Sequence, residues 1–151
     1  MGDICIYGCA MIYQIAYNSF ATHKMTRDIV RDILATSRLH NMQHGITGLL
    51  LIKNDAVFQI IEGRQTDIEP LYRRIQLDSR HHSVSTLLER TINTRQFPEW
   101  SMGYNDLTEK SDNLPSYAFK LSMETLCKAI PRSASQDLDP FIQTYSKVAG
   151  L

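Results

Sequence analysis

The fold is decided by Gly45-Ile-Thr-Gly-Leu-Leu-Leu-Ile52, which is followed by Lys53-Asn-Asp-Ala56 and then by Val57-Phe-Gln-Ile-Ile-Glu-Gly63. The first segment is an almost continuous apolar run, which is typical of a central strand covered on both faces. Residues 53–56 predict a short turn, and residues 57–63 predict the hairpin partner of that strand. We therefore expect a β-hairpin at the centre of a sheet.

On the N-terminal side of this hairpin the chain predicts one strand and one helix. Residues 11–17 alternate between two faces, with Tyr13 and Tyr17 on the same face, which favours a strand. Thr26 is a candidate N-cap, and apolar residues recur at helical spacing from there to about Asn41. We expect this helix to end near Gly45.

On the C-terminal side the pattern predicts a helix over about residues 67–78. A cap at Thr66 would place Pro70 at the fourth helical position, where a backbone amide is needed, so Asp67 is the expected N-cap. Two strands should follow this helix, a longer one around residues 84–95 and a short one at residues 100–104.

The order of these elements gives an α+β fold of the ferredoxin-like βαββαβ(β) type, with two helices on one face of the sheet. Two C-terminal helices, expected at about 116–130 and 138–148, are the candidates to cover the other face. We divide the chain into an N-terminal extension (1–10), a sheet domain (11–105) and a C-terminal helical cap (106–151).

Composition excludes several classes of function. Sixteen basic and sixteen acidic residues give a formal net charge of zero, which argues against non-specific nucleic-acid binding and permits self-association. Three cysteines have neither metal-ligand spacing nor the density of a disulfide scaffold. The apolar stretch 4–17 is too short to span a bilayer and lacks the basic start of a signal peptide. We expect a soluble, cytoplasmic protein without a metal site.

Two polar residues stand on a face that should be apolar. Gln59 shares a face with Val57 and Ile61, and Tyr17 ends the apolar face of the first strand. An unpaired buried amide costs roughly 1–3 kcal/mol, so Gln59 needs a partner. Two interpretations stay open at this point: a purely structural contact with backbone or with Tyr17, and a ligand held between the helices and the sheet. Phosphate-binding loops and hydrolase elbows are absent from the sequence.

Five segments, in order, carry a resemblance to a known family. They are Tyr13-Gln-Ile-Ala-Tyr-Asn-Ser19, Asn41-x-x-x-Gly-Ile-Thr-Gly-Leu-Leu50, Phe58-Gln-Ile-Ile-Glu-Gly63, Asp78-Ser-Arg-His-His82 and Trp100-Ser-Met102. Together they resemble the BLUF family, the blue-light sensors using flavin. The resemblance implies a ferredoxin-like fold that holds the flavin ring between the two helices.

The resemblance also implies a role for individual residues. Tyr17 is similar to the photoactive tyrosine that donates an electron and a proton, and Gln59 to the glutamine that bridges this tyrosine and the flavin. Asn41 is similar to the asparagine that binds the ring edge, while Trp100 and Met102 resemble the pair that competes for the place beside the glutamine. Further cofactor contacts are implied for Ile33, Ser37, His40, Arg74, Ile75, Asp78, Arg80 and His81.

We therefore expect a non-enzymatic photoreceptor that binds FAD, with FMN or riboflavin as alternatives. Because the roughly 45 residues after the sheet domain are fewer than a typical domain needs, output is expected to pass through the C-terminal region to a separate signalling protein or through homo-oligomers. Direct binding of nucleic acid or membrane is not expected. A light-independent ferredoxin-like ligand-binding or assembly domain is the alternative, and a flavoenzyme with redox turnover is a third class, for which the sequence has no second cofactor motif.

Overall fold

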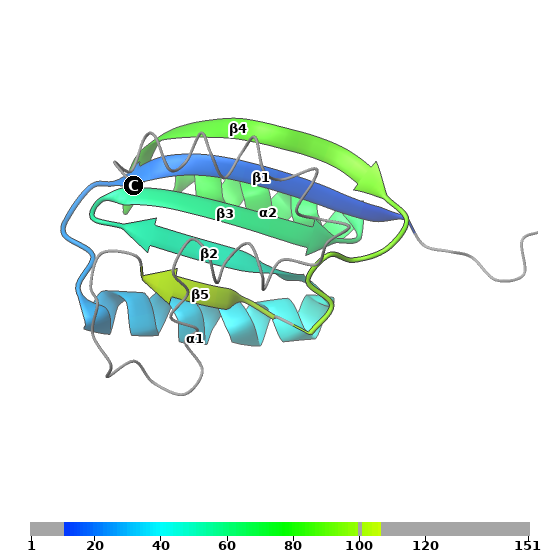
Figure 1. Cartoon of the computed structure of the whole chain (residues 1–151), viewed down its shortest axis with the longest axis horizontal. Helices are drawn as coiled ribbons and strands as arrows, with labels where there is room; N and C mark the ends of the chain where they lie inside the picture. The colour runs from blue at the N-terminus through cyan, green and yellow to red at the C-terminus, as the bar shows by residue number, and fades with distance from the viewer. Residues whose placement is uncertain (1–10, 100, 107–151) are drawn as a thin grey trace, which may run out of the picture.

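The computed structural model describes residues 11–99 and 101–106 of the 151-residue chain. Its elements, labelled in Figure 1, are β1 (Ile12–Ala21), α1 (Arg27–His44), β2 (Thr47–Lys53), β3 (Ala56–Gly63), α2 (Gln65–Leu77), β4 (His81–Ile92) and β5 (Gly103–Asp106). Within these ranges no helix is long and apolar enough to cross a membrane. The predicted C-terminal helices lie outside the described residues.

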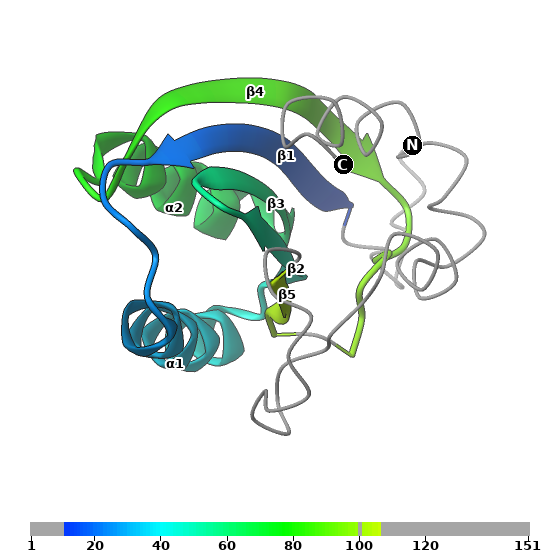
Figure 2. The ribbon, with the colours of Figure 1, turned by 60° about the vertical axis from the view of Figure 1, so that its left-hand side comes forward.

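The five strands form one sheet in the order β4-β1-β3-β2-β5. The first four are antiparallel to their neighbours, and β5 runs parallel to β2. Both helices lie on the same face of the sheet, α2 near β1 and β4 and α1 near β2 and β5 (Figures 1 and 2). The predicted ferredoxin-like α+β fold is confirmed, and β2 and β3 form its central hairpin.

Local chemistry explains where α1 begins and ends. The side chain of Thr26 accepts a hydrogen bond from the amide of Ile29, which satisfies one of the free donors at the start of the helix. Gly45 ends the helix in the left-handed region at φ 62°, where its amide bonds the carbonyl of Asn41. The predicted start and end of this helix are confirmed.

The predicted N-cap of α2 is wrong. The helix begins at Gln65 with Arg64 as the cap residue, two residues before the predicted start, and no side chain caps it. Pairs within the first turns take the place of a cap: Arg64 Nε lies 2.7 Å from the Asp67 carboxylate, and Gln65 donates to Glu69 at 2.8 Å. Pro70 is then inside the helix and removes one hydrogen bond without ending it.

The ends of three strands differ from the sequence pattern. The first strand continues to Ala21, because Asn18, Ser19 and Phe20 keep pairing with β3 after the alternation of apolar residues stops. The fourth strand begins and ends three residues earlier than predicted, at His81 and Ile92, and accommodates a positive φ at Ser83 where its register with β1 shifts. The last strand starts at Gly103 rather than at residue 100.

The two faces of the sheet have different environments, which we call the helix face and the far face. On the helix face, residues of β1, β2 and β3 pack with Val30 and Leu34 of α1 and with Ile68 and Tyr72 of α2. On the far face, Leu49, Leu51, Phe58 and Ile60 are at most 1% exposed. Residues of β2 and β3 are therefore buried on both faces, as the apolar run of the sequence predicts.

Gly48 of β2 is the position where the sheet tolerates no side chain. A Cβ built there would lie 2.0 Å from the carbonyl oxygen of Ile60 on β3, and the neighbouring atoms are also backbone. We expect Gly48→Ala to destabilise the domain by about 2–3 kcal/mol, because the central strand pair must separate to admit a methyl group. Asp32→Ala, on the exposed side of α1, is the control. Denaturant titration checks this, and equal stability of the two variants would contradict the close approach.

Candidate functional site

A cavity of about 310 Å³ lies between the two helices and the helix face of the sheet. This volume is within the range of small-molecule sites. All eleven residues predicted to bind a cofactor line it, and Met102 does too; Trp100 is not among the described residues. The lining residues are Tyr17, Ala21, Met25, Ile33, Thr36, Ser37, His40, Asn41, Leu50, Ile52, Val57, Gln59, Ile61, Leu71, Arg74, Ile75, Asp78, Arg80, His81 and Met102.

Tyr17 and Gln59 face each other across the β1–β3 pair. They are directly opposed in the register, and the phenol of Tyr17 donates a hydrogen bond to Oε1 of Gln59. Tyr17 is only 3% exposed. Burial, followed by the nearby Tyr72 and Asp78, raises the pKa of this phenol well above its ordinary value, so it stays protonated as a donor.

The amide nitrogen of Gln59 has a different neighbour. Its Nε2 lies 3.5 Å from the sulfur of Met102, which is a weak acceptor. The two ends of this one side chain therefore contact the tyrosine on one side and the residue before β5 on the other. A stronger acceptor placed in the cavity would be a better partner for the amide nitrogen.

Helix α1 holds the segment that contains Met102. Asn41, which is 2% exposed, donates from Nδ2 to the carbonyl of Ser101 at 2.7 Å. Arg38 donates from Nε at 3.1 Å and from Nη2 at 2.9 Å to the carbonyl of Met102. Sequence reasoning missed Arg38. Its spacing of three residues from Asn41 places both on one face of the helix, and this was the signal that could have identified it.

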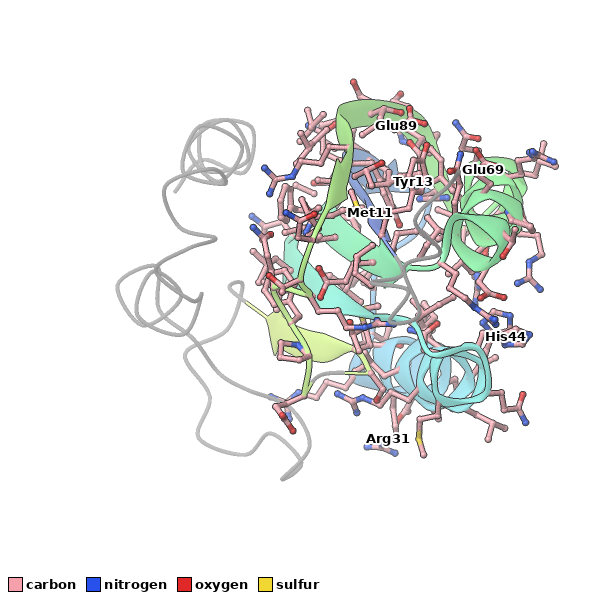
Figure 3. All side chains as sticks on the ribbon, turned by 90° about the vertical axis from the view of Figure 1, so that its right-hand side faces the viewer. Met11, Tyr13, Arg31, His44, Glu69 and Glu89 are labelled. Atoms are coloured by element: carbon pink, nitrogen blue, oxygen red, sulfur yellow. The ribbon has the colours of Figure 1, made fainter. Side chains whose placement is uncertain are left out.

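A contact between the helices borders the cavity at His40. Nη2 of Arg74 on α2 lies 2.8 Å from Nε2 of His40 on α1, which makes this nitrogen the acceptor. The His40 ring also stacks on that of His44, with centroids 4.2 Å apart; Figure 3 shows His44 on the side of α1 that is turned toward α2. Burial and the neighbouring His44 lower the pKa of His40, which favours the neutral ring.

The turn after α2 forms the other side of the cavity. The guanidinium of Arg80 binds the Asp78 carboxylate with its Nε 3.0 Å from Oδ1; this hydrogen bond lowers the pKa of Asp78 and raises that of Arg80. Both nitrogens of His81 are already engaged, Nδ1 by the Ser19 hydroxyl at 2.9 Å and Nε2 by the carbonyl of Ile75. His81 can therefore offer a cavity ligand only the surface of its ring.

The family of the chain follows from a match to a known family. Residues 12–103 match the model of a family described as "Sensors of blue-light using FAD". The chain belongs to the BLUF family. The resemblance seen in the sequence is thereby confirmed, and the matched BLUF domain contains every described element up to the start of β5.

Relatives of the BLUF domain occur in larger proteins. The chain is 34% identical over 96 residues to the photoactivated adenylate cyclase subunit beta of Euglena gracilis, covering 63% of this chain and 11% of the relative. It is 28% identical over 97 residues to the blue light- and temperature-regulated antirepressor BluF of Escherichia coli (strain K12), covering 64% of this chain and 24% of the relative. The chain thus spans 11–13% of the length of the first cyclase relatives it matches.

Solved structures show the same fold. The dark-state structure of BlrB, a BLUF protein, matches with a TM-score of 0.62 at 30% identity, covering 65% of this chain and 74% of BlrB. The photo-activated state of BlsA matches with a TM-score of 0.59 at 34% identity, covering 64% of this chain and 70% of BlsA.

The residues around the cavity fit a flavin. Ile33 on α1 and Ile75 on α2 supply apolar walls, which suit a flat aromatic ring. Gln59 and Asn41 supply amides at the sheet and at α1, and a flavin ring carries oxygen and nitrogen acceptors along one edge. The weak contact between Gln59 Nε2 and the Met102 sulfur leaves this amide able to take such an acceptor.

The hydrogen bond of Asn41 to Ser101 leads to a prediction about flavin retention. Asn41→Ala removes a buried donor to the Ser101 carbonyl and one polar group of the cavity. We expect weaker flavin binding, roughly tenfold for the loss of one buried hydrogen bond. The flavin-to-protein ratio after dialysis measures this. Gln43→Ala, exposed on the same helix, should retain flavin fully. Equal retention in both variants would remove Asn41 from the site.

Proposed function

We propose that this protein is a blue-light photoreceptor whose photoactive pair is Tyr17 and Gln59. The observation that carries the proposal is the buried phenol of Tyr17 donating to the amide oxygen of Gln59 at the wall of the cavity. Membership of the BLUF family supplies the light-sensing class, and this hydrogen bond supports the proposal that Tyr17 and Gln59 carry the chemistry.

When bound in the cavity, a flavin would supply absorption of blue light and an acceptor for one electron and one proton. Tyr17 suits the donor role because its raised pKa keeps the proton on the phenol until the electron leaves. Oε1 of Gln59 accepts the hydrogen bond of the Tyr17 hydroxyl, and Nε2 of Gln59 carries two N–H donors. Rotation or tautomerisation of this amide exchanges an acceptor for a donor at almost constant volume, so the hydrogen bonds change while the packing stays the same.

Met102 is in direct contact with the side chain of Gln59. Its sulfur contacts Nε2 of the amide, and its carbonyl is bound by Arg38. A rearranged Gln59 would present a different atom to the thioether, so the position of Met102 and of the adjoining β5 would depend on the state of the amide. We propose that the signal leaves the domain by this route.

We further propose FAD as the flavin and a separate signalling protein as the recipient of the signal. The family description names FAD, and the exposed guanidinium groups of Arg74 and Arg80 at the cavity suit the phosphates of a flavin nucleotide. Relatives named as cyclases and as an antirepressor link this domain to different outputs in different chains. For this chain we propose a non-enzymatic, homo-oligomeric sensor in the cytoplasm.

One spectrum tests the proposed function. The purified protein should be yellow, and blue light should shift its flavin band to the red, with full recovery in the dark. The shift would arise because a rearranged Gln59 would offer the bound ring a different set of hydrogen bonds. Absorption spectra before, during and after illumination check this. A colourless protein would favour the light-independent assembly domain, and lasting bleaching would favour redox turnover.

Two substitutions assign the pair. Tyr17→Phe removes the donor hydroxyl and Gln59→Leu removes the amide, so each variant should retain flavin and lose the light-induced shift. Tyr13→Phe is the matched control, because this buried phenol lies four residues away on the same strand and bonds Glu89 instead (Figure 3). The difference spectrum measures the effect. A normal shift in either test variant would remove that residue from the mechanism.

A further inference from the structure

A cluster of buried polar groups lies on the far face of the sheet, away from the cavity. It consists of Gln14 on β1, Thr47 on β2, Glu62 on β3 and the segment Gln96–Phe97 between β4 and β5, and we call it the far-face cluster. Glu62 and Gln14 are 0% exposed and Phe97 is 2% exposed. None of these residues lines the cavity.

The Glu62 carboxylate is at the centre of the far-face cluster. Oε1 accepts the backbone amide of Phe97 at 2.7 Å and the hydroxyl of Thr47 at 3.1 Å. Oε2 accepts the backbone amide of Gln96 at 3.1 Å and Nε2 of Gln14 at 3.1 Å. All four partners are donors, which only an ionised carboxylate can satisfy together.

The carboxylate binds two backbone amides that belong to no strand. A buried carboxylate is costly to desolvate, and the nearby guanidinium groups bind its neighbours: Arg95 donates to the Thr47 hydroxyl and to the backbone carbonyl of Glu62, and Arg90 donates to Oε1 of Gln14. An apolar residue at this position would leave the amides of Gln96 and Phe97 without their acceptor. Glu62 therefore gives a fixed place to two consecutive amides of this connection.

The connection held in this way leads directly to the photoactive pair. Four residues separate Phe97 from Met102, whose carbonyl is bound by Arg38 and whose sulfur contacts Gln59. Pro98 and Glu99, which follow Phe97, are exposed. The connection is therefore held at residues 96–97 by Glu62 and just before β5 by α1, and the exposed residues Pro98 and Glu99 follow the first of these contacts.

We propose that Glu62 is a positioning residue for light sensing: by binding the amides of Gln96 and Phe97 it sets where Met102 stands beside Gln59. This rests on the proposed role of Gln59 and extends it to the opposite face of the sheet. Glu62 and Gln59 lie three residues apart on β3, so the strand that carries the photoactive amide also fixes the connection to β5.

The test is Glu62→Gln, which keeps the size of the side chain. In either orientation its NH₂ group faces one of the two backbone amides, so that amide loses its acceptor. In the dark protein we expect amide exchange at Gln96 or Phe97 to rise roughly tenfold or more, as for loss of a hydrogen bond to a charged group. The rate at which the light-induced band shift decays should change by at least about threefold, with flavin content unchanged.

Glu89→Gln is the matched control. It makes the same chemical change on β4. There the Glu89 carboxylate accepts a hydrogen bond from the Tyr13 hydroxyl on the helix face; both residues are labelled in Figure 3. It should leave both the exchange at residues 96–97 and the decay rate unchanged. Equal effects of the two variants would mean that general loosening of the sheet is responsible and would overturn the proposal.

A second variant covers the case in which Glu62→Gln does not fold. Thr47→Val keeps the shape and removes one donor to the oxygen that binds the Phe97 amide, so it should change exchange and decay in the same direction by a smaller factor. Unaltered exchange and decay in the folded variant would overturn the proposal. A wild-type protein without any light-induced shift would instead refute the proposed function, so the two failures are distinguishable.

Discussion

The register between β1 and β3 is the constraint on which the rest of the structure depends. It places Tyr17 opposite Gln59 and Gln14 opposite Glu62. Because side chains alternate along a strand, the first pair faces the helices and the second pair faces away from them. A slip of one residue in β3 would exchange its two faces, so that Gln59 would point away from the helices and Glu62 toward them. The apolar residues between these pairs make such a slip costly, since they are buried on both faces.

Helix α1 contributes to the site in two ways. Its residues Ile33, Ser37 and His40 line the cavity, while Arg38 and Asn41 bind the carbonyls of the segment before β5. The capping of this helix by Thr26 and Gly45 fixes its ends, so both sets of side chains move together if the helix moves. One wall of the cavity and the placement of Met102 therefore both depend on this helix.

The sequence predicted those parts of the fold that depend on local periodicity. The alternation and apolar runs of the sequence predict the β2–β3 hairpin and the two faces of β3. A threonine cap and a glycine predict the two ends of α1. All of these signals act over a few residues. The start of α2 did not follow, because Arg64–Asp67 and Gln65–Glu69 pairs stabilise its first turns without a capping side chain. Alternation singled out Gln59 and Tyr17 as polar residues needing partners, and the family resemblance named the remaining cavity residues.

Other features could not be predicted because they depend on contacts between distant segments. Arg38 is unremarkable in the helical pattern until Met102 is seen to lie beside it. The four donors around Glu62 come from two strands and from a connection without periodic structure. Local rules identify a polar residue on a buried face, but they do not identify which distant amide will meet it.

The two edges of the sheet differ in length within the described residues. At one edge β4 contributes twelve residues, and at the other β5 contributes four, paired in parallel with β2. Regions of a protein with few contacts open with smaller free energies than its core strands. The residues next to Met102 adjoin the shorter edge strand of the described sheet, which has fewer pairs to its neighbour than β4 has.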